Sequence, residues 1–181
     1  MPAGSPWLTK QPALRTLATA PDYWHVYPVA YSPLSANPYS TGRLAVVPVA
    51  GGKSDLGMFY AASDLPGALW EVLLRHVAPD DQRHVHIDVA KLAGMRAVRL
   101  RLRHAAPVLE LGQPGLRVLF PINSPESIAV AALLAEPDTR ATHADARALR
   151  EDLVRVGMTD MPVLSWPSRQ HHPSTVYLAY A

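Results

Sequence analysis

The 181-residue chain contains no cysteine, which excludes disulfide bonds, thiolate metal sites and a cysteine nucleophile. Long apolar runs are missing as well. The longest one, Ile128 to Ala135, is far too short to cross a bilayer, and the N-terminal segment lacks the apolar region of a standard secretory signal peptide. We therefore expect a protein that acts in the cytoplasm and does not bind a membrane.

Strong charge of either sign is also absent. Lysine and arginine number 17 against 15 acidic residues, and no cluster of basic residues resembles a polyanion-binding patch. We therefore expect no direct binding to nucleic acid. Hydrophobic residues make up 49% of the chain and charged residues 18%, which is typical of a globular protein.

The 18 prolines indicate many loops and interrupted strands rather than a helix bundle. The order of apolar patterns predicts a single α+β domain over residues 23–181, with residues 1–22 as a lead-in segment. Pro28 makes the first predicted strand either an edge strand or an interrupted one. Strands are predicted at 23–31, 44–50, 57–60, 84–89, 98–103, 108–111, 163–166 and 175–180, and helices near 13–18, 65–77, 124–136 and 144–156.

The segment 57–77 (GMFYAASDLPGALWEVLLRHV) is the most informative part of the sequence. A short apolar run ends at Tyr60, and Ser63 is the expected cap of a helix that has Pro66 in its first turn. Apolar residues then recur at helical spacing. Glu71 interrupts this pattern in the middle of the helix, so it is a candidate functional residue.

Four parts of the chain, in this order, resemble the RES domain family. The eleven-residue interval between Tyr60 and Glu71 belongs to the resemblance, which spans residues 23–180. The matching segments are YSPLSANPYSTGRL (31–44), MFYAASDLPGALWEVLLR (58–75), the block from IDVAKLAG to RLRHAAPVLELG (87–112), and LSWPSRQ with YLAY (164–170 and 177–180).

The resemblance implies a fold similar to that of ADP-ribosyltransferase toxins and an enzyme that breaks the nicotinamide–ribose bond of NAD. NAD is then the substrate, and no metal is expected. Members are typically toxins paired with an Xre-like helix-turn-helix antitoxin. We therefore expect an antitoxin or immunity protein as partner, in a hetero-oligomer or with the toxin as a homodimer.

The resemblance also implies roles for four residues. Glu71 is the expected catalytic carboxylate, because bond cleavage develops positive charge on the ribose. Ser168 either donates a hydrogen bond to the substrate or orients Glu71. Tyr60 offers an aromatic face to the cationic nicotinamide ring, and Arg43 offers a planar charged group to the diphosphate.

Each residue also has a purely structural interpretation. Glu71 could be a surface glutamate paired with Arg75 one helical turn away. Tyr60 could belong to the core, Arg43 to a solvated loop, and Ser168 to a turn. No Ser-His-Asp arrangement supports Ser168 as a nucleophile.

The chain departs from the family pattern at two positions. It has His25 where an early arginine is usual, and Leu44 where an aromatic residue follows the second arginine. By similarity to diphtheria-toxin-like enzymes, we expect His25 to contact NAD, with a core histidine as the alternative. His84 and His86 share a predicted strand face but lack a third metal ligand.

The leading prediction is therefore an NAD-degrading toxin that acts as a glycohydrolase or phosphorylase. The first alternative is a mono-ADP-ribosyltransferase that modifies a cellular protein. The second is a catalytically weakened binding module, which the missing early arginine would favour.

Overall fold

One seven-stranded mixed sheet organises the computed structural model, which describes residues 7–20, 22–78 and 80–181. The strand order is β1-β5-β6-β7-β3-β2-β4, and only the β5–β6 pair is parallel among the described pairings. The strands are β1 (Arg15–Leu17), β2 (Tyr23–Pro28), β3 (Met58–Ala62), β4 (Met95–Leu100), β5 (Ala106–Glu110), β6 (Val163–Pro167) and β7 (Thr175–Tyr180).

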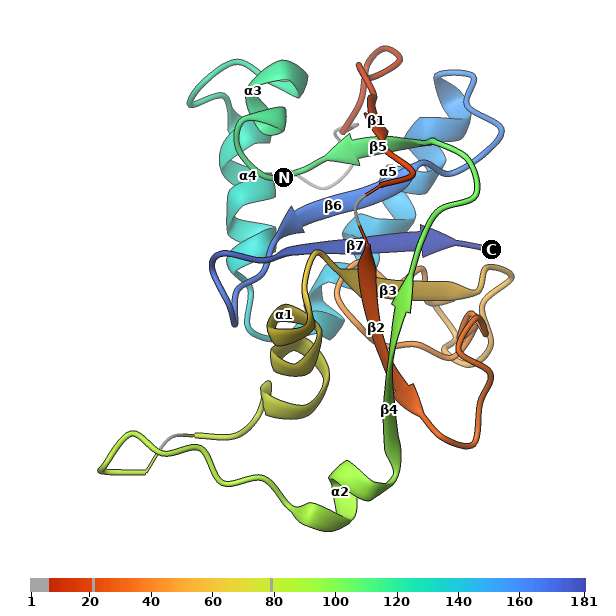
Figure 1. The fold of residues 1–181 in the computed structure, drawn as a ribbon. Coiled ribbons are helices and arrows are strands. Elements are labelled where there is room, and N and C mark those ends of the chain that lie inside the picture. The colour runs from red at the N-terminus through yellow and green to blue at the C-terminus, as the bar shows by residue number, and fades with distance from the viewer. Residues whose placement is uncertain (1–6, 21, 79) are drawn as a thin grey trace.

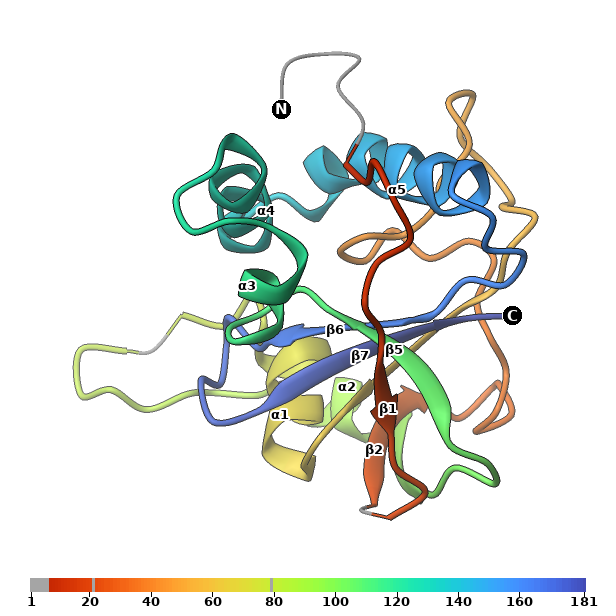
Figure 2. The ribbon, with the colours of Figure 1, turned by 90° about the horizontal axis from the view of Figure 1, so that it is seen from above.

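Short helices connect and cover these strands (Figure 1). They are α1 (Leu65–Leu69), which continues into the π-helical turn η1 (Trp70–Leu74), α2 (Val89–Ala93), α3 (Gly115–Leu119), α4 (Pro125–Ala135), the 3-10 turn η2 (Thr139–Thr142) and α5 (His143–Arg155). Figure 2 shows α4 and α5 on the same side of β6 and β7. None of the described helices is both long enough and apolar enough to span a membrane.

The main hydrophobic core lies between this helical layer and the sheet. It includes Leu109 and Leu164 from the sheet, which are fully buried, and Leu149 and Leu153 from α5. Burial of such side chains contributes about 2 kcal/mol each. A second, smaller cluster joins α1 to β2 and β3 around Ala68. The predicted single α+β domain is confirmed.

The sheet divides at the junction of β2 and β3. These strands share only the Trp24–Ala62 pair, whereas β2 pairs with β4 over six residues and β3 with β7 over five. Figure 1 shows β2 and β4 running steeply across the direction of β6 and β7. The junction is therefore a place where strand backbones separate and side chains can line a cavity.

Several predicted elements are confirmed. Strand β7 has the predicted bounds, and α4 begins after Ser124, whose hydroxyl accepts a hydrogen bond from the Ser127 N–H. Helix α5 ends before Gly157, which has the positive φ of 87° that glycine tolerates.

Other predictions were wrong. Residues 44–50 form a loop with turn hydrogen bonds, and 84–88 form a largely exposed loop that leads into α2, although both segments are β-prone. Residues 15–17 form strand β1 rather than a helix, because β5 offers them a pairing edge. The lead-in segment 1–22 lies partly outside the described residues, which omit 1–6 and 21.

Two local predictions also need correction. Strand β2 is not an edge strand, because β4 covers it, and Pro28 is tolerated as its last residue. Asp64 rather than Ser63 caps α1, since its carboxylate accepts the N–H of Gly67.

Candidate active site

A cavity of about 590 Å³ lies at the β2–β3 junction, enclosed by η1 and the loop before Leu44. Four of the five predicted site residues line it: His25, Arg43, Tyr60 and Glu71. They come from β2, the loop before Leu44, β3 and η1, and the fold brings them together. The fifth, Ser168, is fully buried and lies behind Glu71.

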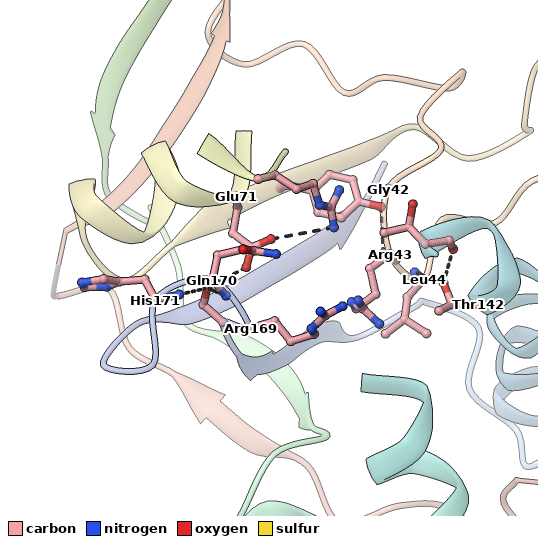
Figure 3. A network of polar contacts seen from close by, with 12 residues as sticks. Gly42, Arg43, Leu44, Glu71, Thr142, Arg169, Gln170 and His171 are labelled. Atoms are coloured by element: carbon pink, nitrogen blue, oxygen red, sulfur yellow. Dashed lines mark hydrogen bonds and ion pairs between the residues drawn. The ribbon is translucent and has the colours of Figure 1, made fainter. Parts of the chain in front are cut away.

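Glu71 lies in the π-helical turn η1, with its side chain 19% exposed. One carboxylate oxygen accepts a hydrogen bond from Ser168 Oγ at 2.6 Å, and the other lies 3.9 Å from an Arg75 guanidinium nitrogen (Figure 3). The ion pair with Arg75 that a structural interpretation predicts is therefore present, but it is long. The shorter contact holds Glu71 from the opposite side.

The hydroxyl of Ser168 has a fixed donor direction. It accepts the backbone N–H groups of Gln170 at 3.1 Å and His171 at 3.0 Å. With these two groups donating to the oxygen, the hydroxyl proton is directed to Glu71. Ser168 also does not line the cavity, so its described contacts fit orientation of Glu71 and not contact with a ligand.

Arg43 is not a solvated loop residue, because only 5% of it is exposed. Its guanidinium donates to the carbonyl of Leu133 at 2.6 Å and to that of Glu136, at the C-terminal end of α4. A cation at this end complements the unpaired carbonyls of the helix. Burial lowers the pKa of Arg43, and the nearby cations Arg169 and Arg75 lower it further.

Three guanidinium groups therefore gather around one catalytic candidate. Arg169 donates to the same Glu136 carbonyl at 3.0 Å, and Figure 3 shows its side chain and that of Arg43 pointing toward one another. Arginine stays charged in proteins, so Arg43, Arg75 and Arg169 leave an excess of positive charge beside Glu71. Such an arrangement suits an anionic ligand.

Tyr60 holds the loop that carries Arg43. Its hydroxyl donates to the Arg43 carbonyl at 3.0 Å, and burial raises its pKa. Leu44, next in sequence, has a positive φ of 59° and donates its N–H to Thr142 Oγ1 at 2.9 Å. Its carbonyl accepts from Tyr180 at 2.9 Å. These contacts stabilise a backbone conformation that is uncommon for leucine.

His25 on β2 forms a side-chain hydrogen bond to the backbone of β3. Its Nδ1 lies 2.7 Å from the Tyr60 carbonyl, which can only accept, so Nδ1 carries the proton. Burial lowers the pKa of His25, which favours the neutral ring with a free lone pair on Nε2. The ring also packs 4.3 Å from Phe59 and stacks on Tyr27, so the core interpretation of His25 agrees with these contacts.

Sequence reasoning missed several residues that shape this site. Arg169 directly follows Ser168 in the segment LSWPSRQ (164–170), so its place beside the predicted site could have been inferred from the sequence. Thr142 directly precedes α5, and its hydroxyl oxygen accepts the backbone N–H of Leu44, which is 98 residues away. Asp64 and Ser174 connect α1 to the β6–β7 loop. Asp64, directly before Leu65, carried the signal of a helix N-cap, whereas Ser174 carried none.

The remaining histidines do not form a metal site. His86 and His84 both lie near the Asp80 carboxylate, at 2.8 and 3.6 Å, on an exposed loop. Within residues 7–20, 22–78 and 80–181, no group of three or more His, Asp or Glu side chains is arranged to hold a metal ion.

Comparisons with known proteins agree with this picture at the level of family. The sequence pattern of the RES domain matches residues 14–181, which is nearly the whole chain. Neither a curated protein nor a solved structure matches it. Because the match covers well over half of the residues, the chain belongs to the RES domain family.

Proposed function

We propose that this protein cleaves the nicotinamide–ribose bond of NAD, with Glu71 as its catalytic carboxylate. The observation that supports this function is a carboxylate on a cavity wall, held at 2.6 Å by a buried serine hydroxyl. The cavity of about 590 Å³ has a size typical of small-molecule sites. Membership of the RES domain family is consistent with an NAD-related toxin function.

The chemistry requires stabilisation of positive charge. When the glycosidic bond breaks, its electron pair leaves with nicotinamide and the ribose becomes oxocarbenium-like. The fixed Glu71 carboxylate stabilises that charge, and Ser168 keeps it oriented without touching the substrate. Water then bonds to the ribose carbon and releases a proton, which gives ADP-ribose and nicotinamide.

The other cavity residues have matching roles in binding. The Tyr60 ring provides a face for the cationic nicotinamide. The free Nε2 of neutral His25 accepts a hydrogen bond from a ribose hydroxyl. Arg75, which lines the cavity, binds the diphosphate. Arg43, whose hydrogen bonds go to α4, and Arg169, which does not line the cavity, supply charge rather than a new hydrogen-bond fork.

The excess of three guanidinium groups over the two carboxylates of Glu71 and Glu136 also favours a second anion. Inorganic phosphate is then a candidate acceptor, and ADP-ribose 1-phosphate the product. The alternatives are transfer of ADP-ribose to a protein and a weakened binding module. We place the activity in the cytoplasm, under control of an Xre-like antitoxin or an immunity protein.

The test measures nicotinamide released from NAD by the purified protein, with and without phosphate. Glu71→Gln removes the charge and keeps the shape, and it should lower the rate at least about 100-fold. Glu151→Gln changes an exposed glutamate on α5, away from the site, and should leave the rate unchanged. Label transfer from NAD to protein would indicate the ADP-ribosyltransferase. No nicotinamide release, even with phosphate and cell extract, would contradict any catalytic role.

A further inference from the structure

Asp64 connects the two segments that carry the proposed catalytic pair. Its carboxylate accepts the Gly67 N–H at 2.8 Å, which caps α1, the helix that continues to Glu71. Both of its oxygens also lie 2.7 Å from the hydroxyl of Ser174, in the loop between β6 and β7 that contains Ser168. One carboxylate therefore holds the helix of Glu71 and the loop of Ser168.

The loop between β6 and β7 is closed by its own hydrogen bonds. The Ser168 N–H donates to the Ser174 carbonyl at 2.8 Å, and the His171 N–H donates to Ser168 Oγ. His171 Nδ1 lies 2.7 Å from Ser174 Oγ. Because the Ser174 proton is directed to Asp64, the His171 ring nitrogen must be the donor in this contact. A displacement of Ser174 is thus transmitted to Ser168.

Helix α1 also approaches this loop very closely. A Cβ built on Gly67 would lie 2.5 Å from both Cβ and Oγ of Ser174, so no side chain fits there without movement. Ser174 itself is 1% exposed. The spacing between the helix and the loop is therefore fixed by direct contact as well as by hydrogen bonds.

A helix cap alone does not account for this arrangement. Capping of α1 uses the Gly67 N–H, whereas the Ser174 hydroxyl and the Ser63 hydroxyl at 2.8 Å add further bonds to the same carboxylate. Burial alone would raise the pKa of Asp64, but the Gly67, Ser174 and Ser63 hydrogen bonds lower it overall. Asp64 is thus an ionised acceptor for several donors.

We propose that Asp64 and Ser174 are positioning residues that hold Ser168 Oγ against Glu71 and so aim the carboxylate into the cavity. The proposal rests on the proposed function of Glu71. Because Glu71 acts on charge that develops in the transition state, loss of its orientation should lower kcat and leave KM nearly unchanged.

Two matched substitutions separate positioning from stability. Asp64→Asn keeps a good N-cap, because the amide oxygen still accepts the backbone N–H of the first helical turn. It replaces the second carboxylate oxygen with an NH2 group, which cannot accept the hydrogen bond of the Ser174 hydroxyl. Ser174→Ala removes that hydroxyl. Ser54→Ala is the control, because Ser54 is 3% exposed, also accepts a backbone N–H, and does not line the cavity.

We expect Asp64→Asn and Ser174→Ala to lower kcat about tenfold, the equivalent of one hydrogen bond, with KM changed less than twofold. The double variant Ser168→Ala/Ser174→Ala should be no slower than Ser168→Ala alone, since both act through Glu71. The proposal would be overturned if the losses in kcat of the two single variants multiplied in the double variant. It would also be overturned if kcat of Ser174→Ala equalled that of Ser54→Ala.

A crystal structure of Ser174→Ala tests the positioning without reference to activity. We expect the distance from Ser168 Oγ to Glu71 Oε1 to increase beyond hydrogen-bond range from its present 2.6 Å. An unchanged distance would overturn the positioning role even if the wild-type protein cleaves NAD. A wild-type protein that releases no nicotinamide, combined with an increased distance in Ser174→Ala, would refute only the proposed reaction.

Discussion

Replacement of Arg43 tests whether this residue stabilises the folded protein or only contributes charge to the candidate site. Arg43 is 5% exposed, and its guanidinium donates to the carbonyls of Leu133 and Glu136 at the end of α4. Hydrogen bonds that involve a charged group contribute about 1.5–3 kcal/mol each, so loss of both in Arg43→Ala should lower the free energy of unfolding by about 3–6 kcal/mol. In a domain of this size, such a loss lowers Tm by about 10 °C.

Arg169→Ala is the matched control. Arg169 donates to the same Glu136 carbonyl at 3.0 Å, but it lies on the surface, where such a contact contributes about 1 kcal/mol or less. Arg43→Lys keeps the charge without the planar fork, so its free energy of unfolding should lie between those of the wild type and Arg43→Ala.

Urea unfolding followed by circular dichroism measures these differences, with the m-value checked for a constant two-state transition. If Arg43→Ala lost no more stability than Arg169→Ala, the anchoring of Arg43 by α4 would be refuted. The arginine would then be free to form a fork on a diphosphate, as the family resemblance implied.

Three further predictions concern residues that line the cavity or hold its walls in place. At saturating NAD, where the binding role of Arg75 does not limit the rate, Ser168→Ala should lower kcat about 10- to 100-fold and Arg75→Ala less than tenfold. The reason is that a hydrogen bond to a charged group contributes more than an ion pair at 3.9 Å. Steady-state assays would contradict this if Arg75→Ala had the lower kcat. Burial lowers the pKa of His25 in the folded protein below its ordinary value of 6.5, so the unfolded protein binds more protons and the wild type should lose stability as the pH falls below about 6.5. In urea unfolding from pH 7 to pH 5, His25→Gln should lose less stability than the wild type. An equal loss would refute the neutral His25 ring. Thr142→Val leaves the buried backbone N–H of Leu44 without its acceptor and should lower the free energy of unfolding by about 1–3 kcal/mol, measured by urea unfolding. A change below about 0.5 kcal/mol would show that this N–H finds another acceptor.

The parts of the fold that could be predicted are those with strong local signals. Ser124 followed by Pro125 begins α4, and Gly157 ends α5, because caps and positive φ depend on a few neighbouring residues. The loop 44–50 shows the limit of such reasoning. Val46 and Val47 pack against the main core while Val49 is 88% exposed, and the backbone of the loop forms turn hydrogen bonds instead of a strand ladder. Only the tertiary structure decides between these outcomes.

In the candidate site as well, local sequence patterns could be recognised, whereas contacts between distant segments could not be predicted. Tyr60 and Glu71 belong to one strand–helix segment, so their eleven-residue interval could be recognised in the sequence. The contact between Ser168 and Glu71 joins residues 97 apart, and the acceptors of Arg43 lie 90 and 93 residues away. The family resemblance brought these residues to attention, but their mutual contacts depend on how β6, η1 and α4 pack, which no local pattern records.

The contacts divide the site residues into two physical classes. His25, Tyr60 and Arg43 each donate a hydrogen bond to a backbone carbonyl near the cavity or at the end of α4, so they hold the cavity walls in place while they line it. Glu71 only accepts, and its described partners are the side chains of Ser168 and Arg75. A carboxylate that supports no backbone group can be changed without opening the fold. Loss of activity in Glu71 variants should therefore report on chemistry, whereas the same loss in the other three must be corrected for the fraction of protein that is folded.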